Sequence, residues 1–158
     1  MHCLWPQIES CQSHLWRAVC GYETEAAARE DLLQEVLLAL WEALPKLRDP
    51  QRLLPFALRV AHNLGASHVR RAVRDRRRVP IDECDLDHNA ATSAPDDRSQ
   101  WLYSALNRLP VTLRQPLMLQ LEGFEYKEIA EMLGISVDNV GVRVHRARAQ
   151  LKSWSGQE

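Results

Sequence analysis

Apolar side chains recur every three or four positions along most of the chain, the spacing of one face of an α-helix. The clearest run contains Leu32, Val36, Leu40 and Leu44, each four residues after the last. Tyr, Phe and Thr are few, and the alternating β-branched runs that favour strands are missing. The pattern therefore predicts an all-α protein.

The same periodicity sets the expected helices. A first helix is expected over residues 8–20, a second from a cap at Thr24 to a stop at Pro45, and a third over residues 53–78. Two more are expected at about 101–109 and 112–122, with Pro116 near the first turn of the latter and Gly123 as its C-terminal cap.

A segment with few large apolar residues separates these helices into two groups. Residues 80–98 read PIDECDLDHNAATSAPDDR, which is too acidic and too poor in large apolar side chains to fold alone. We therefore expect two small helical domains, residues 1–79 and 100–158, joined by a flexible acidic linker over residues 80–99.

Charge is distributed unevenly although the 158 residues have a net charge of only −1. Residues 51–80 carry 8 basic and 1 acidic side chains, whereas residues 81–100 carry 1 basic and 6 acidic ones. A basic stripe within a neutral chain indicates a surface that binds a polyanion. A solvated helix face remains the alternative.

The stretch from residue 125 to residue 151 reads EYKEIAEMLGISVDNVGVRVHRARAQL. It predicts a short helix with Ala130 on its inner face, a turn at Gly134 and a basic second helix capped by Ser136. Such a helix-turn-helix places its second helix in the DNA major groove. An ordinary helical hairpin is the alternative for this segment taken alone.

Residues 105–151 resemble region 4 of the extracytoplasmic-function (ECF, group IV) sigma factors of bacterial RNA polymerase. The matching elements include Leu109-Pro110, Arg114, Glu128-Ile129-Ala130, Leu133-Gly134-Ile135-Ser136 and Arg146-Ala147-Arg148. Upstream, DLLQEVLLALW at residues 31–41 and FALRVAHNLGASHVRR at residues 56–71 resemble two helices of region 2 of the same family. Both resemblances occur in the family's order on either side of the linker.

The resemblance implies a sigma factor that binds core RNA polymerase, at its β′ clamp and β flap, and directs initiation at promoter DNA. It implies that the −35 element is bound by Ser136, Asp138, Asn139, Arg143, Arg146 and Arg148. It implies that the −10 element is bound by Arg52, Arg59, Asn63, Arg70, Arg71 and Arg74, and the polymerase by Asp31, Gln34, Glu35, Leu38 and Trp41. It also implies an unstacked −10 base held by residues 46–52, a linker in the RNA path, and an anti-sigma factor as a partner.

The chain departs from the family at several positions. Phe56 stands where Trp is usual, and Ser67 where Asp is usual, while the usual Asn63 is retained. In the second helix of the motif, Asn139, Gly141 and Val142 replace residues that are commonly Thr, a basic residue and Ser. Gly141 also costs that helix about 1 kcal/mol relative to alanine.

Two other classes of function remain open on the residues alone. A helix-turn-helix regulator acting without polymerase would not need the acidic surface around Asp31. A metal- or thiol-dependent enzyme would use His14, Cys3, Cys11 and Cys20, but their spacing matches no common zinc pattern and no paired acid and base accompany them. We expect a cytoplasmic protein without catalytic residues, cofactor, metal or membrane insertion.

Overall fold

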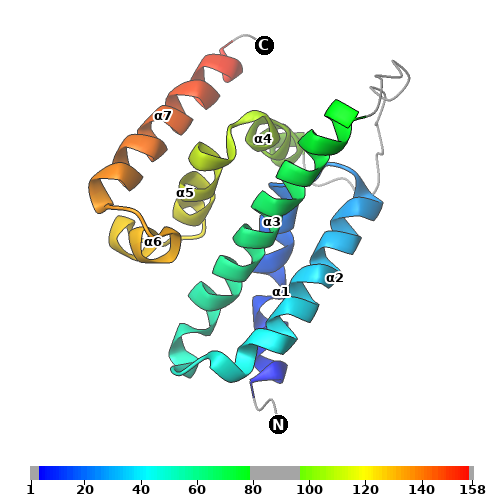
Figure 1. Cartoon of the computed structure of the whole chain (residues 1–158). Helices are drawn as coiled ribbons and strands as arrows, with labels where there is room; N and C mark the ends of the chain where they lie inside the picture. The colour runs from blue at the N-terminus through cyan, green and yellow to red at the C-terminus, as the bar shows by residue number, and fades with distance from the viewer. Residues whose placement is uncertain (1–3, 79–96, 157–158) are drawn as a thin grey trace.

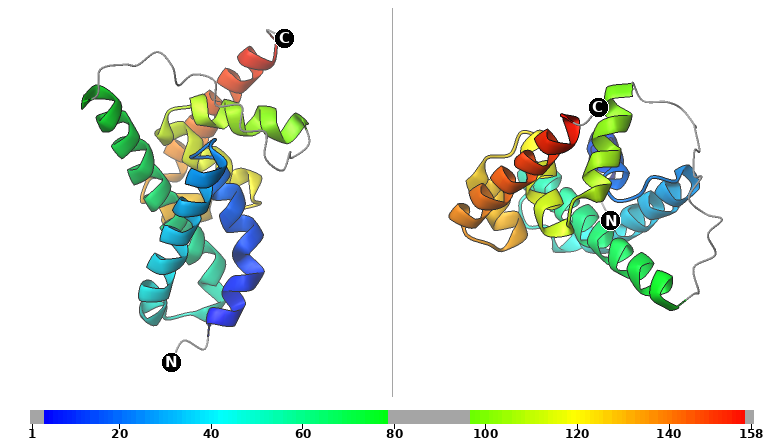
Figure 2. Two further views of the ribbon diagram at one scale, coloured as in Figure 1. Left: turned by 90° about the vertical axis from the view of Figure 1, so that its right-hand side faces the viewer. Right: turned by 90° about the horizontal axis from the view of Figure 1, so that it is seen from above.

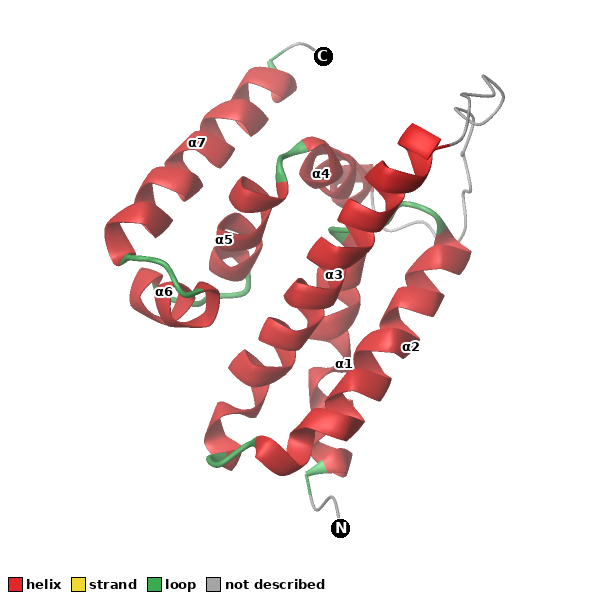
Figure 3. Ribbon diagram, viewed as in Figure 1, coloured by secondary structure: helices red, strands yellow, loops and turns green. Residues whose placement is uncertain are grey.

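All regular structure in the described part of the chain is helical, which confirms the all-α prediction. The computed structural model describes residues 4–78 and 97–156, here called the N-terminal half and the C-terminal half. The long helices are α1 (Trp5–Cys20), α2 (Ala26–Ala43), α3 (Leu53–Arg78), α4 (Asp97–Arg108), α5 (Val111–Leu121), α6 (Tyr126–Leu133) and α7 (Val137–Ser155) (Figures 1 and 3). Most of the expected acidic linker, together with Cys3 and Cys84, lies outside the described residues.

The N-terminal half is a bundle in which α1, α2 and α3 contact one another pairwise. Each helix buries one stripe of apolar side chains spaced three or four residues apart. These stripes comprise Ile8, Cys11 and Leu15 of α1, Leu32, Val36 and Leu40 of α2, and Ala57, Leu58 and Ala61 of α3. The bounds of α3 match those that its periodicity predicts. The other faces of the three helices are left for polar side chains and for partners.

The start of α2 differs from the sequence-based expectation. Its N-cap residue is Glu25, not Thr24, and no side chain caps the helix there. The Glu23 carboxylate instead accepts the backbone N–H groups of Thr24, at 2.8 Å, and Glu25, at 3.3 Å. His68 of α3 lies 3.1 Å from the other oxygen of the same carboxylate. Glu23 therefore orders the turn before α2 and connects this turn to α3, while the first N–H groups of α2 itself have no side-chain cap.

One expectation about proline was right and another was wrong. The α-helix α2 ends at Ala43, beside Pro45 as expected, and Leu44–Lys46 follow as a 3₁₀ turn, η1. Pro116 lies in the interior of α5, beyond its first turn, and is buried there. A proline at that position leaves one carbonyl of the preceding turn without its helical donor. The second 3₁₀ turn, η2 (Pro50–Arg52), leads directly into α3.

In the C-terminal half, α5 and α6 pack on α7 (Figure 1). The α7 helix lies at the edge of the molecule, apart from the α1–α3 bundle in Figure 1 and in the right-hand view of Figure 2. The two halves meet where α6 packs on α3 and where residues of α4 and α5 form hydrogen bonds with the N-terminal half. Buried side chains of both halves form one continuous apolar core.

A buried arginine of α5 connects the two halves. Arg114 is only 4% exposed, and its guanidinium donates to the carbonyl of Gly21 at 3.2 Å, just after α1 ends. It also donates to the carbonyls of Asn107, at 3.1 Å, and Leu109, at 2.7 Å, at the end of α4. Burial lowers the pKa of Arg114, although this arginine remains charged at neutral pH.

Glu122, just after α5, forms the second polar connection between the halves. Its carboxylate accepts two hydrogen bonds from Arg17 of α1, at 2.8 and 2.9 Å, and lies 2.6 Å from Nδ1 of His14. Burial acts to raise the pKa of the Glu122 carboxyl, but the bonds from Arg17 and His14 outweigh burial and hold that pKa below its usual value. The carboxylate is therefore ionised at neutral pH.

A buried histidine lies beneath this interface. His62 of α3 is within 2.6 Å of the Tyr22 hydroxyl, and its backbone carbonyl accepts a hydrogen bond from Gln115 of α5. Burial lowers the pKa of His62 to about 4, against a small opposing effect of Glu122. Burial has the opposite effect on the Tyr22 hydroxyl and raises its pKa, because here the charged form is the deprotonated one. At neutral pH the imidazole is uncharged, and Nδ1 shares a hydrogen bond with the Tyr22 hydroxyl.

We expect acid to destabilise the fold through His62. The unfolded chain protonates this histidine near pH 6.5, whereas the folded chain does so only near pH 4, so unfolding takes up a proton in between. Stability should fall as the pH is lowered through this window, by roughly 2 kcal/mol between pH 8 and pH 5. Urea unfolding at several pH values measures it. His62→Gln should flatten the dependence, and parallel curves for both proteins would contradict the assignment.

Candidate nucleic-acid interface

The predicted helix-turn-helix is formed by α6, a tight turn and α7. The turn uses Gly134, whose φ of 70° lies in the left-handed region that favours glycine. Before it, Glu125 and Glu128 form a reciprocal capping box at the start of α6. After it, the Ser136 hydroxyl accepts the N–H of Asn139 at 3.1 Å and caps α7. The backbone groups at the end of α6 and at the start of α7 therefore have hydrogen-bond partners close in sequence, and this sets the direction of α7.

Burial on α7 divides the helix into an inner and an outer face. Val140, Val144 and Ala147 are buried, and α7 packs with this side on α5 and α6. Asp138 and Arg146, both predicted to bind the −35 element, are exposed. The outer face is thus free in this structure to meet a duplex.

The other predicted −35 residues have partners within the chain. Ser136 caps α7, and Asn139 accepts a hydrogen bond from Nε of Arg143 at 3.2 Å. Arg148 donates twice to the side-chain oxygen of Gln120, at 2.6 and 3.2 Å. These bonds hold Arg143 and Arg148 along the flanks of the helix, on either side of the outer face, where phosphates would pass.

Four of the six predicted −10 residues form a stripe along α3. Arg59, Asn63, Arg70 and Arg74 follow one another at intervals of four or seven residues, so they share one exposed face. Arg71 instead turns toward α2, where its guanidinium lies 3.3 Å from the Glu35 carboxylate. The structure therefore groups four of the six residues on α3 and separates Arg71 from them.

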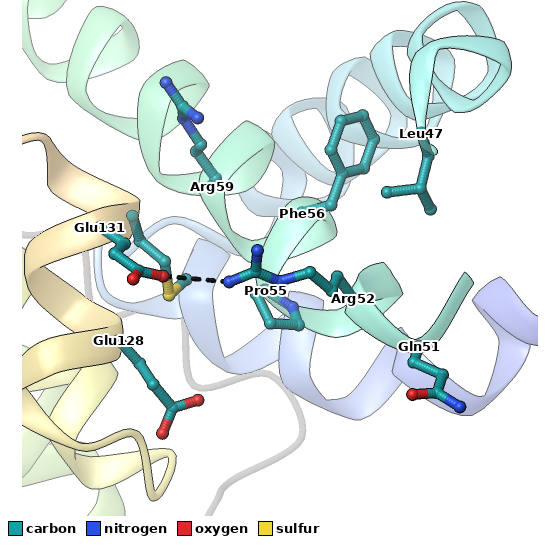
Figure 4. A pocket seen from close by; sticks show the side chains of 9 residues that line it. Leu47, Gln51, Arg52, Pro55, Phe56, Arg59, Glu128 and Glu131 are labelled. Carbon is teal, nitrogen blue, oxygen red and sulfur yellow. Dashed lines mark hydrogen bonds and ion pairs between the residues drawn. The ribbon is translucent and has the colours of Figure 1, made fainter. Parts of the chain in front are cut away.

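The sixth residue, Arg52, lies in a groove between the two halves (Figure 4). The groove has a volume of about 390 Å³ and is lined by Leu47, Gln51, Arg52, Pro55, Phe56 and Arg59 from one half and by Glu128, Glu131 and Met132 of α6 from the other. Arg52 lies 3.0 Å from the Glu131 carboxylate, and both side chains are more than half exposed. Two carboxylates of α6 thus border the basic end of the α3 stripe.

The predicted polymerase-binding residues lie together on the outer side of α2. Asp31, Gln34, Glu35, Leu38 and Trp41 are all exposed, and Leu38 is 61% exposed although it is apolar. The Trp41 ring, itself 44% exposed, meets the Trp5 ring edge-on at a centroid distance of 4.9 Å. A surface with exposed Leu and Trp among acidic groups is typical of a protein-binding site.

The residues suggested for a metal or thiol site do not converge. Cys11 and Cys20 are free, buried thiols of α1, and burial raises the pKa of Cys20. His14 contacts Glu122 instead. Within residues 4–78 and 97–156 there is no group of three or more His, Cys, Asp and Glu side chains placed to hold a metal ion.

Sequence reasoning did not identify the residues that join the two halves. Arg17, Gln115, Glu122 and Glu131 each contact a residue more than fifty positions away. No local pattern marks such residues, because a polar side chain that pairs across an interface looks like any other surface residue in sequence.

Comparison with known protein families shows the class to which this protein belongs. The sigma-70 region 2 family matches residues 7–75, and the sigma-70 region 4 family matches residues 99–151. The first match covers most of the α1–α3 bundle, and the second contains the helix-turn-helix. The protein is therefore of the sigma-70 class.

Similar whole chains define the family more narrowly. The ECF sigma factor ShbA of Streptomyces griseus is 32% identical over 137 residues, which span 81% of this chain and 72% of ShbA. RfaY of Xanthomonas campestris, a probable sigma factor, is 28% identical over 92% of this chain, and the ECF sigma factor SigE of Mycolicibacterium smegmatis is 30% identical over 79%. The chain spans only 38% of RfaY and 51% of SigE. It belongs to the ECF family of RNA polymerase sigma factors.

Solved structures agree with the fold. The sigma factor RpoE of Bartonella quintana, in complex with the anti-sigma factor NepR, aligns with a TM-score of 0.74 at 24% identity, covering 97% of this chain and 96% of RpoE. CnrH, in complex with the cytosolic domain of CnrY, aligns with a TM-score of 0.69 at 23% identity. In the described part of the chain, every helix is too short or too polar to cross a membrane.

Proposed function

We propose that this protein binds core RNA polymerase and directs it to promoters through separate −10 and −35 contacts. The observation that carries the proposal is that one chain presents the basic stripe on α3 and the exposed outer face of α7. A polymerase-binding surface on α2 accompanies them. In this proposal the protein performs no reaction of its own and acts in the cytoplasm, where bacterial transcription takes place.

We further propose that residues 1–79 and 100–158 act as two recognition modules joined by residues 80–99. The acidic linker would follow the positively charged RNA path of the polymerase, as the family resemblance implies. The complex of RpoE with the anti-sigma factor NepR supports an anti-sigma factor as a further partner.

A helix-turn-helix regulator that acts without polymerase accounts for α7 but not for α2. Its DNA binding would need no exposed leucine and tryptophan set among the carboxylates of Asp31 and Glu35. The match to sigma-70 region 2 over residues 7–75 also favours the polymerase-bound role. Binding of core enzyme therefore separates the two proposals.

The polymerase surface can be tested by replacing Gln34 and Glu35 together with alanine. We expect several-fold weaker binding of core enzyme in a titration, with unchanged helical content, because both side chains are exposed and the Glu35–Arg71 pair stabilises the fold by less than about 1 kcal/mol. The matched control replaces one Glu and one Gln on the exposed side of α1, as Glu9→Ala with Gln12→Ala. Equal affinities for variant and control would refute the assignment of α2.

The −35 surface can be tested with Arg146→Ala. This exposed arginine should neutralise a phosphate, so the holoenzyme should bind a −35 duplex less tightly, with a salt slope reduced by about one unit. Binding of a −10 single strand should not change, because α3 carries that contact. Fluorescence anisotropy over a salt series measures both. Arg98→Ala on α4 removes the same charge elsewhere and serves as the control; an equal loss on both probes would contradict the proposal.

The −10 surface can be tested through its acidic border. In the free protein, the Glu131 carboxylate pairs with Arg52 and would repel an approaching phosphate. Glu131→Gln should therefore tighten the binding of a −10 single strand by up to about fivefold. Glu9→Gln on α1 makes the same change of charge away from the groove and should have little effect. Identical anisotropy titrations for these two variants would show that α6 does not restrict the −10 surface.

A further inference from the structure

The centre of the outer face of α7 carries an apolar side chain. Val142 is 46% exposed and lies on the opposite side of the helix from the buried Val140, Val144 and Ala147. One helical turn away on either side are Asp138 and Arg146, both exposed. A valine at this position has no role in the core, so its methyl groups are open to contact whatever meets the outer face of α7.

Gly141 leaves the helix surface beside Val142 without a side chain. A methyl group added there would meet only the ring of Tyr126, at an ordinary 3.6 Å, so packing does not demand the glycine. Long cationic side chains occur at Arg146, one turn from Val142, and at Arg143 and Arg148 on the flanks of the helix. The missing side chain at position 141 gives Val142 room to approach the floor of a major groove while the arginines meet the phosphates.

The exposed valine is not part of a larger apolar patch on this helix. Val137 is also 45% exposed, but it precedes Val142 by five residues and therefore faces a different direction. The neighbours of Val142 on its own face are Asp138, His145, Arg146 and Ala149, a mainly polar and charged set. Such a surface suits a polyanion better than an apolar groove of a partner protein.

In the major groove, the apolar group that a valine can contact is the 5-methyl group of thymine. Each of the other unmodified bases presents only hydrogen-bonding groups and ring C–H edges there. We propose that Val142 selects a thymine within the −35 element by van der Waals contact with this methyl group. The inference rests on the proposed role of α7 in −35 binding and adds a residue that determines sequence preference there.

The test removes the methyl group and the valine separately and together. A −35 duplex chosen from a library by the holoenzyme is synthesised with each thymine in turn replaced by deoxyuracil, which lacks only the methyl group. Affinities are measured for the wild type and for Val142→Ala, with Val137→Ala as a control of equal size and exposure. Alanine is a better helix former than valine, so circular dichroism should show α7 intact.

At one thymine, we expect deoxyuracil to weaken wild-type binding by about three- to fivefold. Val142→Ala should lose the same factor on the thymine duplex and should not respond to deoxyuracil at that position. Val137→Ala should respond as the wild type does. Sensitivity confined to one base pair would support a direct contact between Val142 and that thymine.

Three other outcomes would overturn the inference. Full sensitivity of Val142→Ala to deoxyuracil at every thymine would show that the valine reads no methyl group. Unchanged DNA binding with loss of core-enzyme binding would assign Val142 to a protein surface. If the library yields no preferred duplex upstream of the −10 element, the proposed role of α7 in −35 binding fails, and this inference fails with it.

Discussion

The buried guanidinium of Arg114 connects α5 to the ends of α1 and α4, and the arrangement of the two halves depends on it. Its donors meet the carbonyls that follow α1 and end α4, where helices leave unpaired acceptors and a partial negative charge. A buried charge is stable only where such partners surround it. Any shift of α5 against α1 would leave this charge without some of its hydrogen-bond acceptors, so α5 is held in one position. Since α6 and α7 pack on α5, their positions follow.

In this arrangement one of the two proposed DNA surfaces is open, and the other faces carboxylates of the opposite half. The outer face of α7 lies away from the α1–α3 bundle and is open, whereas the basic end of the α3 stripe faces the carboxylates of α6 across the groove at Arg52 (Figure 4). An exposed ion pair, Arg52 with Glu131, connects the groove walls, and such pairs contribute at most about 1 kcal/mol. The strong contacts between the halves are elsewhere, at Arg114, Glu122 and Gln115. Access to the full α3 stripe therefore depends on contacts that lie outside it.

The local predictions that failed did so for identifiable reasons. Thr24 was expected to cap α2, but the helix has Glu25 as its N-cap, and the turn before it is held by Glu23, which also reaches His68 of α3. Pro116 was expected at a helix start, yet it lies inside α5, where apolar packing offsets one lost hydrogen bond. Both errors arose because tertiary contacts outweighed a local preference of about 1–3 kcal/mol.

The sequence by itself determined the helices, the helix-turn-helix and the stripe on α3, because these depend on residues a few positions apart. Periodicity predicted the bounds of α3, and Gly134 with Ser136 predicted the turn before α7. Only the tertiary structure decided that Glu131 meets Arg52, that Arg114 reaches Gly21 and that Glu122 meets His14. These partners are 79, 93 and 108 residues apart. Contacts over such distances follow from how whole helices pack, and no spacing along the chain encodes them.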